Sequence, residues 1–184
     1  DLGGGLGVNY KDETPPNPAS YAEVISETIG GLDVEITVEP GRFLVANAGI
    51  LVSKVIFVKE TAVRRFVIVD AAMNDFIRPT LYDAEHSILC EKKFSEVIEG
   101  PAQIVGPVCE TGDILVKEVA LPNINSHDLI ALCSAGAYGA VMGSSYNTRL
   151  PTPEVLVKHK EFSIVRPRQT YSHILSLDRI PSWL

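Results

Sequence analysis

Asp1-Leu2-Gly3-Gly4-Gly5-Leu6-Gly7 is the stretch that decides the fold class of the first part of this chain. It is typical of a buried strand that passes into a phosphate-cradling loop, because glycine has no Cβ and its amides can converge on an anion. A plain tight turn is the alternative interpretation. Since the stretch lacks an initiator methionine and a secretory signal, we expect the chain to be the back part of a longer protein.

The residues that follow continue an α/β pattern. A helix is predicted from Asn17, a suitable N-cap, to Gly30, because apolar residues recur between them at helical spacing. Residues 32–39 alternate apolar and polar side chains as a strand does, and a short helix is expected through Ala46. The order strand, loop, helix, strand, loop, helix is that of a parallel α/β sheet or barrel, to which we assign residues 1–48.

From residue 49 the pattern changes to short apolar runs separated by Gly, Pro, Asn and Asp. This pattern predicts an antiparallel β domain, either a sandwich or a closed barrel, over residues 49–184. A last short helix is expected at residues 171–177. The apolar runs lie at residues 50–58, 66–69, 87–90, 102–105, 114–119, 129–133 and 155–165.

Composition narrows the functional classes. The 184 residues are 46% hydrophobic and 21% charged, which is typical of a folded globular chain. A net charge of −7 and a pI near 5.1 argue against nucleic acid or an anionic membrane as a partner. No apolar run approaches the about 20 residues of a spanning helix. The three cysteines have no metal-ligand spacing, so we expect no metal and a reducing cytoplasm.

Glu39-Pro40-Gly41-Arg42 follows the predicted strand at residues 32–39. In parallel barrels, functional groups gather where the strands end. A carboxylate there can hold a ring nitrogen protonated, and an arginine three residues later can hold an anion. The alternative is an exposed Glu–Arg pair on a loop.

Further candidates lie in the β part. Arg78 and Tyr82, four residues apart, can converge on one carboxylate. Cys109 lies beside Glu110 in a loop bounded by Pro and Gly, where proton transfer suits it better than packing. Small residues surround Tyr138, so its hydroxyl can reach a phosphate or a substrate. The alternatives are a surface arginine, a buried cysteine and a tyrosine that closes a turn.

The remaining cysteines and histidines are interpreted as structural. Cys90 and Cys133 lie within apolar strand runs and are assigned to the core. His86, His127 and His159 lack metal-like neighbours, so structural or exposed positions are expected for them.

Taken in order, these segments resemble the fold-type III pyridoxal-phosphate-dependent decarboxylases, and within them the diaminopimelate decarboxylase family. The resemblance implies a (β/α)8 barrel, of which residues 1–48 would be the last strands and helices, followed by a C-terminal β domain over residues 49–184. It also implies a cytoplasmic homodimer with shared active sites. The matching segments are residues 1–7, 39–42, 73–86, 105–113, 135–147 and 177–184.

The resemblance implies pyridoxal 5'-phosphate as cofactor and decarboxylation of meso-2,6-diaminopimelate to L-lysine and CO2, the last step of lysine biosynthesis. Cys109 would be the catalytic proton donor, supplied to the neighbouring subunit. The family's Schiff-base lysine lies earlier in the barrel, so the chain alone is expected to be inactive. The cofactor-binding residues would be Gly5, Glu39, Pro40, Gly41, Arg42 and Tyr138, and the substrate-binding residues Arg42, Arg78, Tyr82, Glu110 and Tyr138.

The predicted substrate-binding residues favour meso-diaminopimelate over the substrates of related decarboxylases. Arg78 and Tyr82 beside a single carboxylate, Glu110, suit a substrate tail that carries both a carboxylate and an ammonium group. A decarboxylase for carboxynorspermidine, arginine or ornithine is one alternative. The other is a non-catalytic regulatory paralogue, against which the presence of Glu39 and Cys109 argues.

Overall fold

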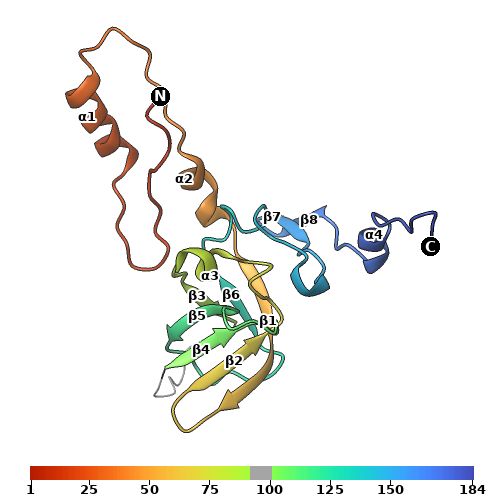
Figure 1. The fold of residues 1–184 in the computed structure, drawn as a ribbon. Helices are drawn as coiled ribbons and strands as arrows, with labels where there is room; N and C mark the ends of the chain where they lie inside the picture. The colour runs from red at the N-terminus through yellow and green to blue at the C-terminus, as the bar shows by residue number, and fades with distance from the viewer. Residues whose placement is uncertain (92–100) are drawn as a thin grey trace.

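The structure is a computed structural model that describes residues 1–91 and 101–184. Six strands form its central sheet, and they lie in the order β3-β6-β1-β2-β4-β5 (Figure 1). An N-terminal arm and a C-terminal arm leave this sheet in different directions. The six strands are β1 (Leu51–Glu60), β2 (Arg65–Val69), β3 (Ile88–Cys90), β4 (Ala102–Val105), β5 (Ile114–Val119) and β6 (Leu129–Leu132).

The sheet is mixed, so the expectation of a wholly antiparallel domain is wrong at one pair. Strand β1 pairs antiparallel with β2 and β6, but β2 and β4 run parallel, with Arg65 opposite Ala102. The physical reason is the long connection between β2 and β4, which is not a tight turn and lets β4 enter the sheet in the same direction. The predicted apolar runs otherwise coincide with the strands.

The core lies on one side of this curled sheet. Alternate residues of β2 point inward, and Val67 and Val69 are completely buried. Phe76 is also fully buried and packs in the same cluster as Ile104. Burial of such side chains stabilises the domain by roughly 1.5–3 kcal/mol each. Phe76 thereby anchors the short helix α3 (Arg78–Tyr82), which follows it directly.

The N-terminal arm contains α1 (Pro18–Ile29) and α2 (Gly41–Val45), and α2 continues into the 3-10 helix η1 (Ala46–Ala48). The predicted start of the first helix is confirmed, because the Asn17 side chain accepts a hydrogen bond from the backbone N–H of Ser20 at 2.9 Å.

The strands predicted at residues 1–7 and 32–39 are not formed. Two backbone hydrogen bonds join these segments: Leu2 N–H donates to the oxygen of Thr37 at 3.0 Å, and Glu39 N–H to that of Gly3 at 2.8 Å. The two segments run in the same direction, but two bonds do not make a sheet, which needs further strands and a covered face. The apolar side chains of residues 32–38 remain exposed, and the assignment of residues 1–48 to the end of a barrel stays a prediction.

The C-terminal arm contains a two-stranded antiparallel hairpin and a helix. The apolar run at residues 155–165 forms β7 (Glu154–Lys158) and β8 (Glu161–Arg166). The expected last helix is confirmed as α4 (Tyr171–Leu175), capped by the Thr170 side chain. Within residues 1–91 and 101–184, none of the helices combines the length and the apolar character that crossing a membrane requires.

Candidate functional site

The glycine-rich loop adopts backbone conformations that favour glycine. Gly3 and Gly5 have φ angles of +69° and +97°, and a Cβ on Gly4 would lie 2.5 Å from the backbone oxygen of Glu39. Among the described residues, no acceptor pairs with the backbone N–H groups of residues 4–7. Adjacent backbone N–H groups without an acceptor in the protein are suited to bind an anion such as a phosphate. The loop therefore fits the predicted phosphate-binding role.

Glu39 lies directly beside this loop. Besides its bond to Gly3, its backbone oxygen accepts a hydrogen bond from Gly41 N–H at 2.7 Å. Pro40 then leads into α2 as its N-cap. The Glu39 side chain is exposed, and no described residue forms a hydrogen bond or ion pair with its carboxylate. The backbone thus fixes the acid next to the glycine-rich loop and leaves its carboxylate free.

Two arginines from different segments approach the ring of one tyrosine. The Cζ atom of Arg42, on α2, lies 5.7 Å from the centre of the Tyr138 ring, and that of Arg78, on α3, lies 5.4 Å from it. These distances are those of cation–π contacts. Tyr138 itself is 40% exposed and has a φ of +68°. Three of the predicted site residues are thus brought together.

The loop that carries Tyr138 packs tightly against the end of α2. Ala135 N–H donates to the oxygen of Gly49 at 2.8 Å, and Gly136 N–H donates to that of Ala46 at 3.0 Å. A Cβ on Gly136 would overlap the backbone oxygen of Val45. Only glycine allows this close approach, and it fixes the tyrosine that follows two residues later.

Arg78 and Tyr82, both on α3, differ in burial. Arg78 is 7% exposed, and its Nη1 donates to the hydroxyl of Tyr10 at 2.7 Å, whereas Tyr82 is 61% exposed. The Arg78 guanidinium contacts two rings, that of Tyr10 in the N-terminal arm and that of Tyr138 in the loop after β6. Tyr10 was missed by the sequence analysis, and its only signal is an aromatic residue shortly after the glycine-rich loop.

Cys109 lies in the loop between β4 and β5 and is exposed. Its neighbour Glu110 accepts a hydrogen bond from the hydroxyl of Tyr146 at 3.3 Å. Cys90 and Cys133 are partly buried instead, and burial raises the pKa of both thiols. Cys109 is therefore the most accessible of the three thiols.

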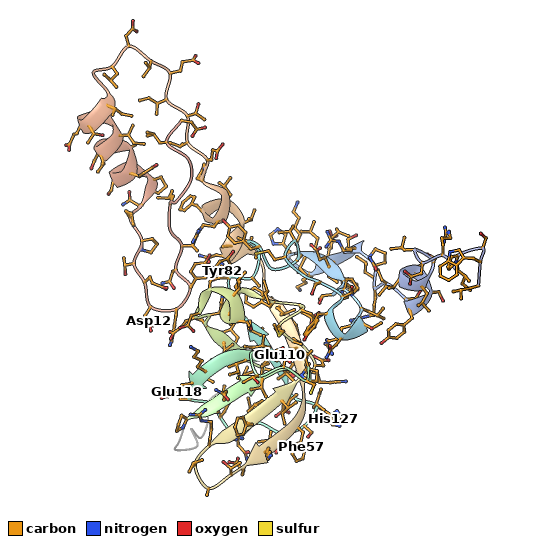
Figure 2. All side chains as sticks on the ribbon, in the orientation of Figure 1. Asp12, Phe57, Tyr82, Glu110, Glu118 and His127 are labelled. Atoms are coloured by element: carbon orange, nitrogen blue, oxygen red, sulfur yellow. The ribbon has the colours of Figure 1, made fainter. Side chains whose placement is uncertain are left out.

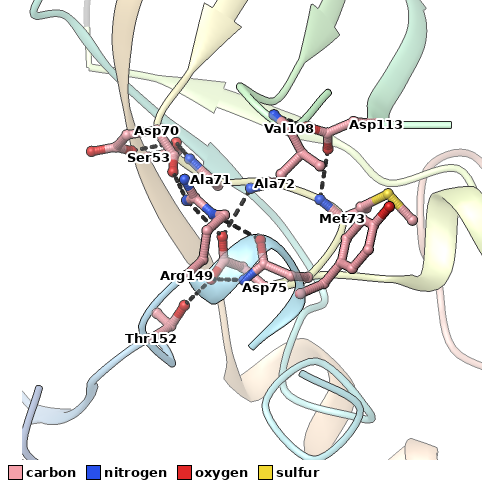
Figure 3. A network of polar contacts seen from close by, with 12 residues as sticks. Ser53, Asp70, Ala71, Ala72, Met73, Asp75, Val108, Asp113, Arg149 and Thr152 are labelled. Atoms are coloured by element: carbon pink, nitrogen blue, oxygen red, sulfur yellow. Dashed lines mark hydrogen bonds and ion pairs between the residues drawn. The ribbon is translucent and has the colours of Figure 1, made fainter. Parts of the chain in front are cut away.

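Asp113 holds the loop that carries Cys109. Only 3% of Asp113 is exposed, and its carboxylate accepts hydrogen bonds from the backbone N–H of Met73 at 2.7 Å and of Val108 at 2.8 Å (Figure 3). Burial raises the pKa of the Asp113 carboxyl, although the two N–H groups act in the opposite direction. The carboxylate thus joins the loop to the segment that precedes α3.

A second network holds that segment in turn (Figure 3). Asp75 accepts hydrogen bonds from Ala72 N–H at 2.9 Å and from the Thr152 hydroxyl at 2.8 Å. Arg149 forms an ion pair with Asp75 at 3.2 Å and donates to the Asn74 side chain at 2.8 Å. The sequence analysis did not identify Arg149 and Thr152, because their partners Asn74 and Asp75 lie 74 to 77 positions away along the chain.

The loop of Cys109 is also joined to α3. The Thr80 hydroxyl donates to the backbone oxygen of Gly112 at 2.7 Å. No hydrogen bond or ring contact joins Cys109 or Glu110 to the cluster of Arg42, Arg78 and Tyr138 within the described residues. Figure 2 shows Tyr82 at the base of the N-terminal arm and Glu110 closer to the sheet.

A cavity of about 790 Å³ lies elsewhere, between α3, β3 and β5. It is lined by His86, Lys117 and Glu118 among others, and by none of the predicted site residues. The glycine-rich loop and the arginine–tyrosine cluster, which have the chemistry of a site, do not line this cavity. We therefore base the candidate site on these residues and not on the cavity.

Comparison with known proteins shows the family of the chain. The family model of the pyridoxal-dependent decarboxylase C-terminal sheet domain matches residues 19–136. Over 186 aligned residues, the chain is 47% identical to the diaminopimelate decarboxylase of Zymomonas mobilis and covers 44% of it, with the whole chain aligned. The chain thus spans less than half the length of this relative.

Two solved structures extend the comparison. The crystal structure of diaminopimelate decarboxylase from M. jannaschii in co-complex with L-lysine matches the whole chain with a TM-score of 0.91 and 38% identity, over 43% of that structure. Lysine/ornithine decarboxylase from Vibrio vulnificus, complexed with cadaverine, matches 79% of the chain with a TM-score of 0.71 and 27% identity, over 40% of that structure.

Proposed function

Because the chain belongs to the pyridoxal-dependent decarboxylase family through its C-terminal sheet domain, we propose that it forms the C-terminal part of a diaminopimelate decarboxylase. The whole protein would convert meso-2,6-diaminopimelate to L-lysine and CO2 in the cytoplasm. Greater similarity to a diaminopimelate decarboxylase than to a lysine/ornithine decarboxylase supports this substrate.

The observation that carries the proposal is the cluster beside the glycine-rich loop. Arg42 and Arg78 approach one ring, that of Tyr138, next to unpaired backbone N–H groups and a free carboxylate. An anionic ring cofactor and a dicarboxylate substrate require just such a combination of positive charge, N–H donors and one acid.

These residues fit pyridoxal 5'-phosphate. When bound, the cofactor supplies an electron sink for the bond that breaks as CO2 leaves. Gly5 would donate its N–H to the phosphate, and Glu39 would hold the proton on the ring nitrogen. Pro40 and Gly41 place Glu39 and Arg42 at opposite ends of one turn. Arg42 and Tyr138 would bind both the cofactor and the substrate.

The remaining residues would recognise the far end of the substrate and return a proton. Arg78 would bind the distal carboxylate, with Tyr82 beside it, and Glu110 would meet the distal ammonium group. Cys109 would return a proton to the α-carbon that has lost CO2. Among the described residues, no hydrogen bond or ring contact joins Cys109 or Glu110 to the arginine–tyrosine cluster. This supports their action in the site of a second copy, in a homodimer with shared active sites.

Substrate profiling of the complete enzyme tests this proposal. We expect CO2 release and L-lysine formation from meso-diaminopimelate, and much slower reaction with L-ornithine or L-arginine. A preference for either of the latter would overturn the choice of substrate. A complete protein that decarboxylates none of them and binds no cofactor would instead support the non-catalytic paralogue.

The proton-donor role has its own test. In the complete enzyme, Cys109→Ala should lower kcat by about a hundredfold or more and change substrate binding little, because the thiol acts after binding. Cys90→Ala is the matched control, since it removes a partly buried thiol of β3 and should leave kcat unchanged. An effect of Cys109→Ala on KM alone would contradict the role.

A further inference from the structure

Arg78 places its positive charge in the interior of the chain without a carboxylate partner. It is 7% exposed, no described acid forms an ion pair with it, and its Nε atom is buried without a hydrogen-bond partner. A buried charge of this kind is strongly unfavourable unless an anion is supplied. Under the proposed function, that anion is the distal carboxylate of the substrate.

Tyr10 is the described residue that contacts this guanidinium most extensively. The Cζ atom of Arg78 lies 4.6 Å from the centre of the Tyr10 ring, and the Tyr10 hydroxyl accepts the Nη1 hydrogen bond at 2.7 Å. The ring of Tyr138 lies on Arg78 as well, at 5.4 Å. One phenol therefore contributes both a face and an acceptor, which together fix the direction of the planar guanidinium.

Tyr10 is itself held by the sheet domain, although it follows the glycine-rich loop in sequence. Its backbone oxygen accepts hydrogen bonds from the N–H and the hydroxyl of Ser87, at 2.9 and 3.0 Å. The ring of His86 meets the Tyr10 ring edge to face, with centres 5.0 Å apart. The preceding residue, Asn9, accepts a hydrogen bond from Ser134 at 3.2 Å.

We infer that Tyr10 is a positioning residue for substrate recognition, which acts by holding Arg78. The inference rests on the proposed function, because it takes Arg78 as the residue that binds the distal carboxylate. The Tyr10 hydroxyl occupies one N–H of the fork and leaves the remaining N–H groups for two parallel hydrogen bonds to a carboxylate. Tyr10 also connects the glycine-rich loop to the residue that recognises the substrate tail.

The test uses two competitive inhibitors of the complete enzyme. L-Lysine keeps the carboxylate that Arg78 would bind, and cadaverine is the same diamine without it. Tyr10→Phe keeps the ring and removes the hydroxyl. We expect the inhibition constant of L-lysine to rise about tenfold in Tyr10→Phe, and that of cadaverine to stay unchanged. The KM for meso-diaminopimelate should rise similarly, with a smaller change in kcat.

Controls separate positioning from folding. Tyr21→Phe removes a hydroxyl that has no partner among the described residues, and should change neither inhibition constant. Tyr10→Leu removes the ring and the hydroxyl together, and should raise the inhibition constant of L-lysine by about a hundredfold. If Tyr10→Leu does not fold, the Tyr10→Phe comparison decides alone.

The outcomes distinguish the inference from the proposed function. An equal rise of the inhibition constants of L-lysine and cadaverine in Tyr10→Phe would indicate a structural role and overturn the inference. Unchanged inhibition by both would overturn it too, while leaving the proposed function intact. A wild-type enzyme that fails to decarboxylate meso-diaminopimelate, or binds L-lysine no better than cadaverine, would overturn the proposed function, and the inference with it.

Discussion

Removal of the Asp113 carboxylate is the sharpest test of how the chain holds Cys109. Asp113→Ala leaves the N–H groups of Met73 and Val108, which it bonds at 2.7 and 2.8 Å, without their acceptor. Hydrogen bonds to a charged group contribute about 1.5–3 kcal/mol each. Two of them would give about 3–6 kcal/mol, but burial of the carboxylate offsets part of this, as its raised pKa indicates.

We therefore expect Asp113→Ala to lower the free energy of unfolding by about 2–4 kcal/mol. Asp113→Asn keeps one oxygen acceptor but places an NH2 group against the other backbone N–H. We expect it to lower the free energy of unfolding by about 1–2 kcal/mol. In the complete enzyme, kcat should fall in the same order, by about tenfold or more for Asp113→Ala, because the thiol is displaced.

Urea unfolding followed by circular dichroism, together with steady-state kinetics, measures both effects. Asp83→Asn is the matched control, because it removes the same charge from a side chain that is 73% exposed and forms an exposed ion pair with Lys117. A surface pair of this kind contributes about 0–1 kcal/mol. If Asp113→Ala were as stable and as active as Asp83→Asn, the role assigned to the buried carboxylate would be refuted.

Three further predictions concern the shared sites, the buried His86 and the loop that carries Tyr138. Mixing inactive Cys109→Ala and Glu39→Ala enzymes, with subunit exchange, should restore about a quarter of the wild-type activity if each site combines residues of two copies; no recovery would contradict shared sites. Burial lowers the pKa of His86, so the folded state favours the neutral ring. The contribution of the neutral His86 ring to the free energy of unfolding is complete above the ordinary pKa of about 6.5. It is lost as the pH falls below that value, by at most about 1.4 kcal/mol per pH unit. This pH dependence should disappear in urea titrations of His86→Gln. Gly136→Ala should cost about 1–3 kcal/mol in the same assay and raise KM, because its Cβ overlaps a backbone oxygen, whereas Gly31→Ala meets open space and should be neutral.

Local signals in the sequence predicted the local structure well. The cap at Asn17, the glycines that follow the first helix, and the apolar runs of the sheet each act within a few residues, and the structure confirms them. The strand expected at residues 32–39 did not form, because strand pairing depends on more than the local sequence. Alternation shows only that a segment can pair, and neighbours elsewhere in the chain decide whether it does.

The site was predictable in part. The glycine-rich loop and Glu39 are adjacent in space, and Tyr138 meets Arg42, as the order of motifs suggested. The partner of Arg78 was not predictable, because Tyr10 lies 68 positions away and no local pattern marks it. The same holds for Asp113, whose partner Met73 is 40 positions away. Motifs point to candidate site residues, whereas tertiary contacts show which residues hold them in place.

The C-terminal arm has a consequence for how the protein is produced. The ribbon of β7 and β8 exposes apolar side chains on both faces, among them Leu156 at 64% and Phe162 at 74%. A two-stranded ribbon without a covered face has little cohesion of its own, so its order depends on whatever packs against it. Substitutions in this ribbon should therefore change the expression yield and the aggregation of the purified chain more than they change turnover.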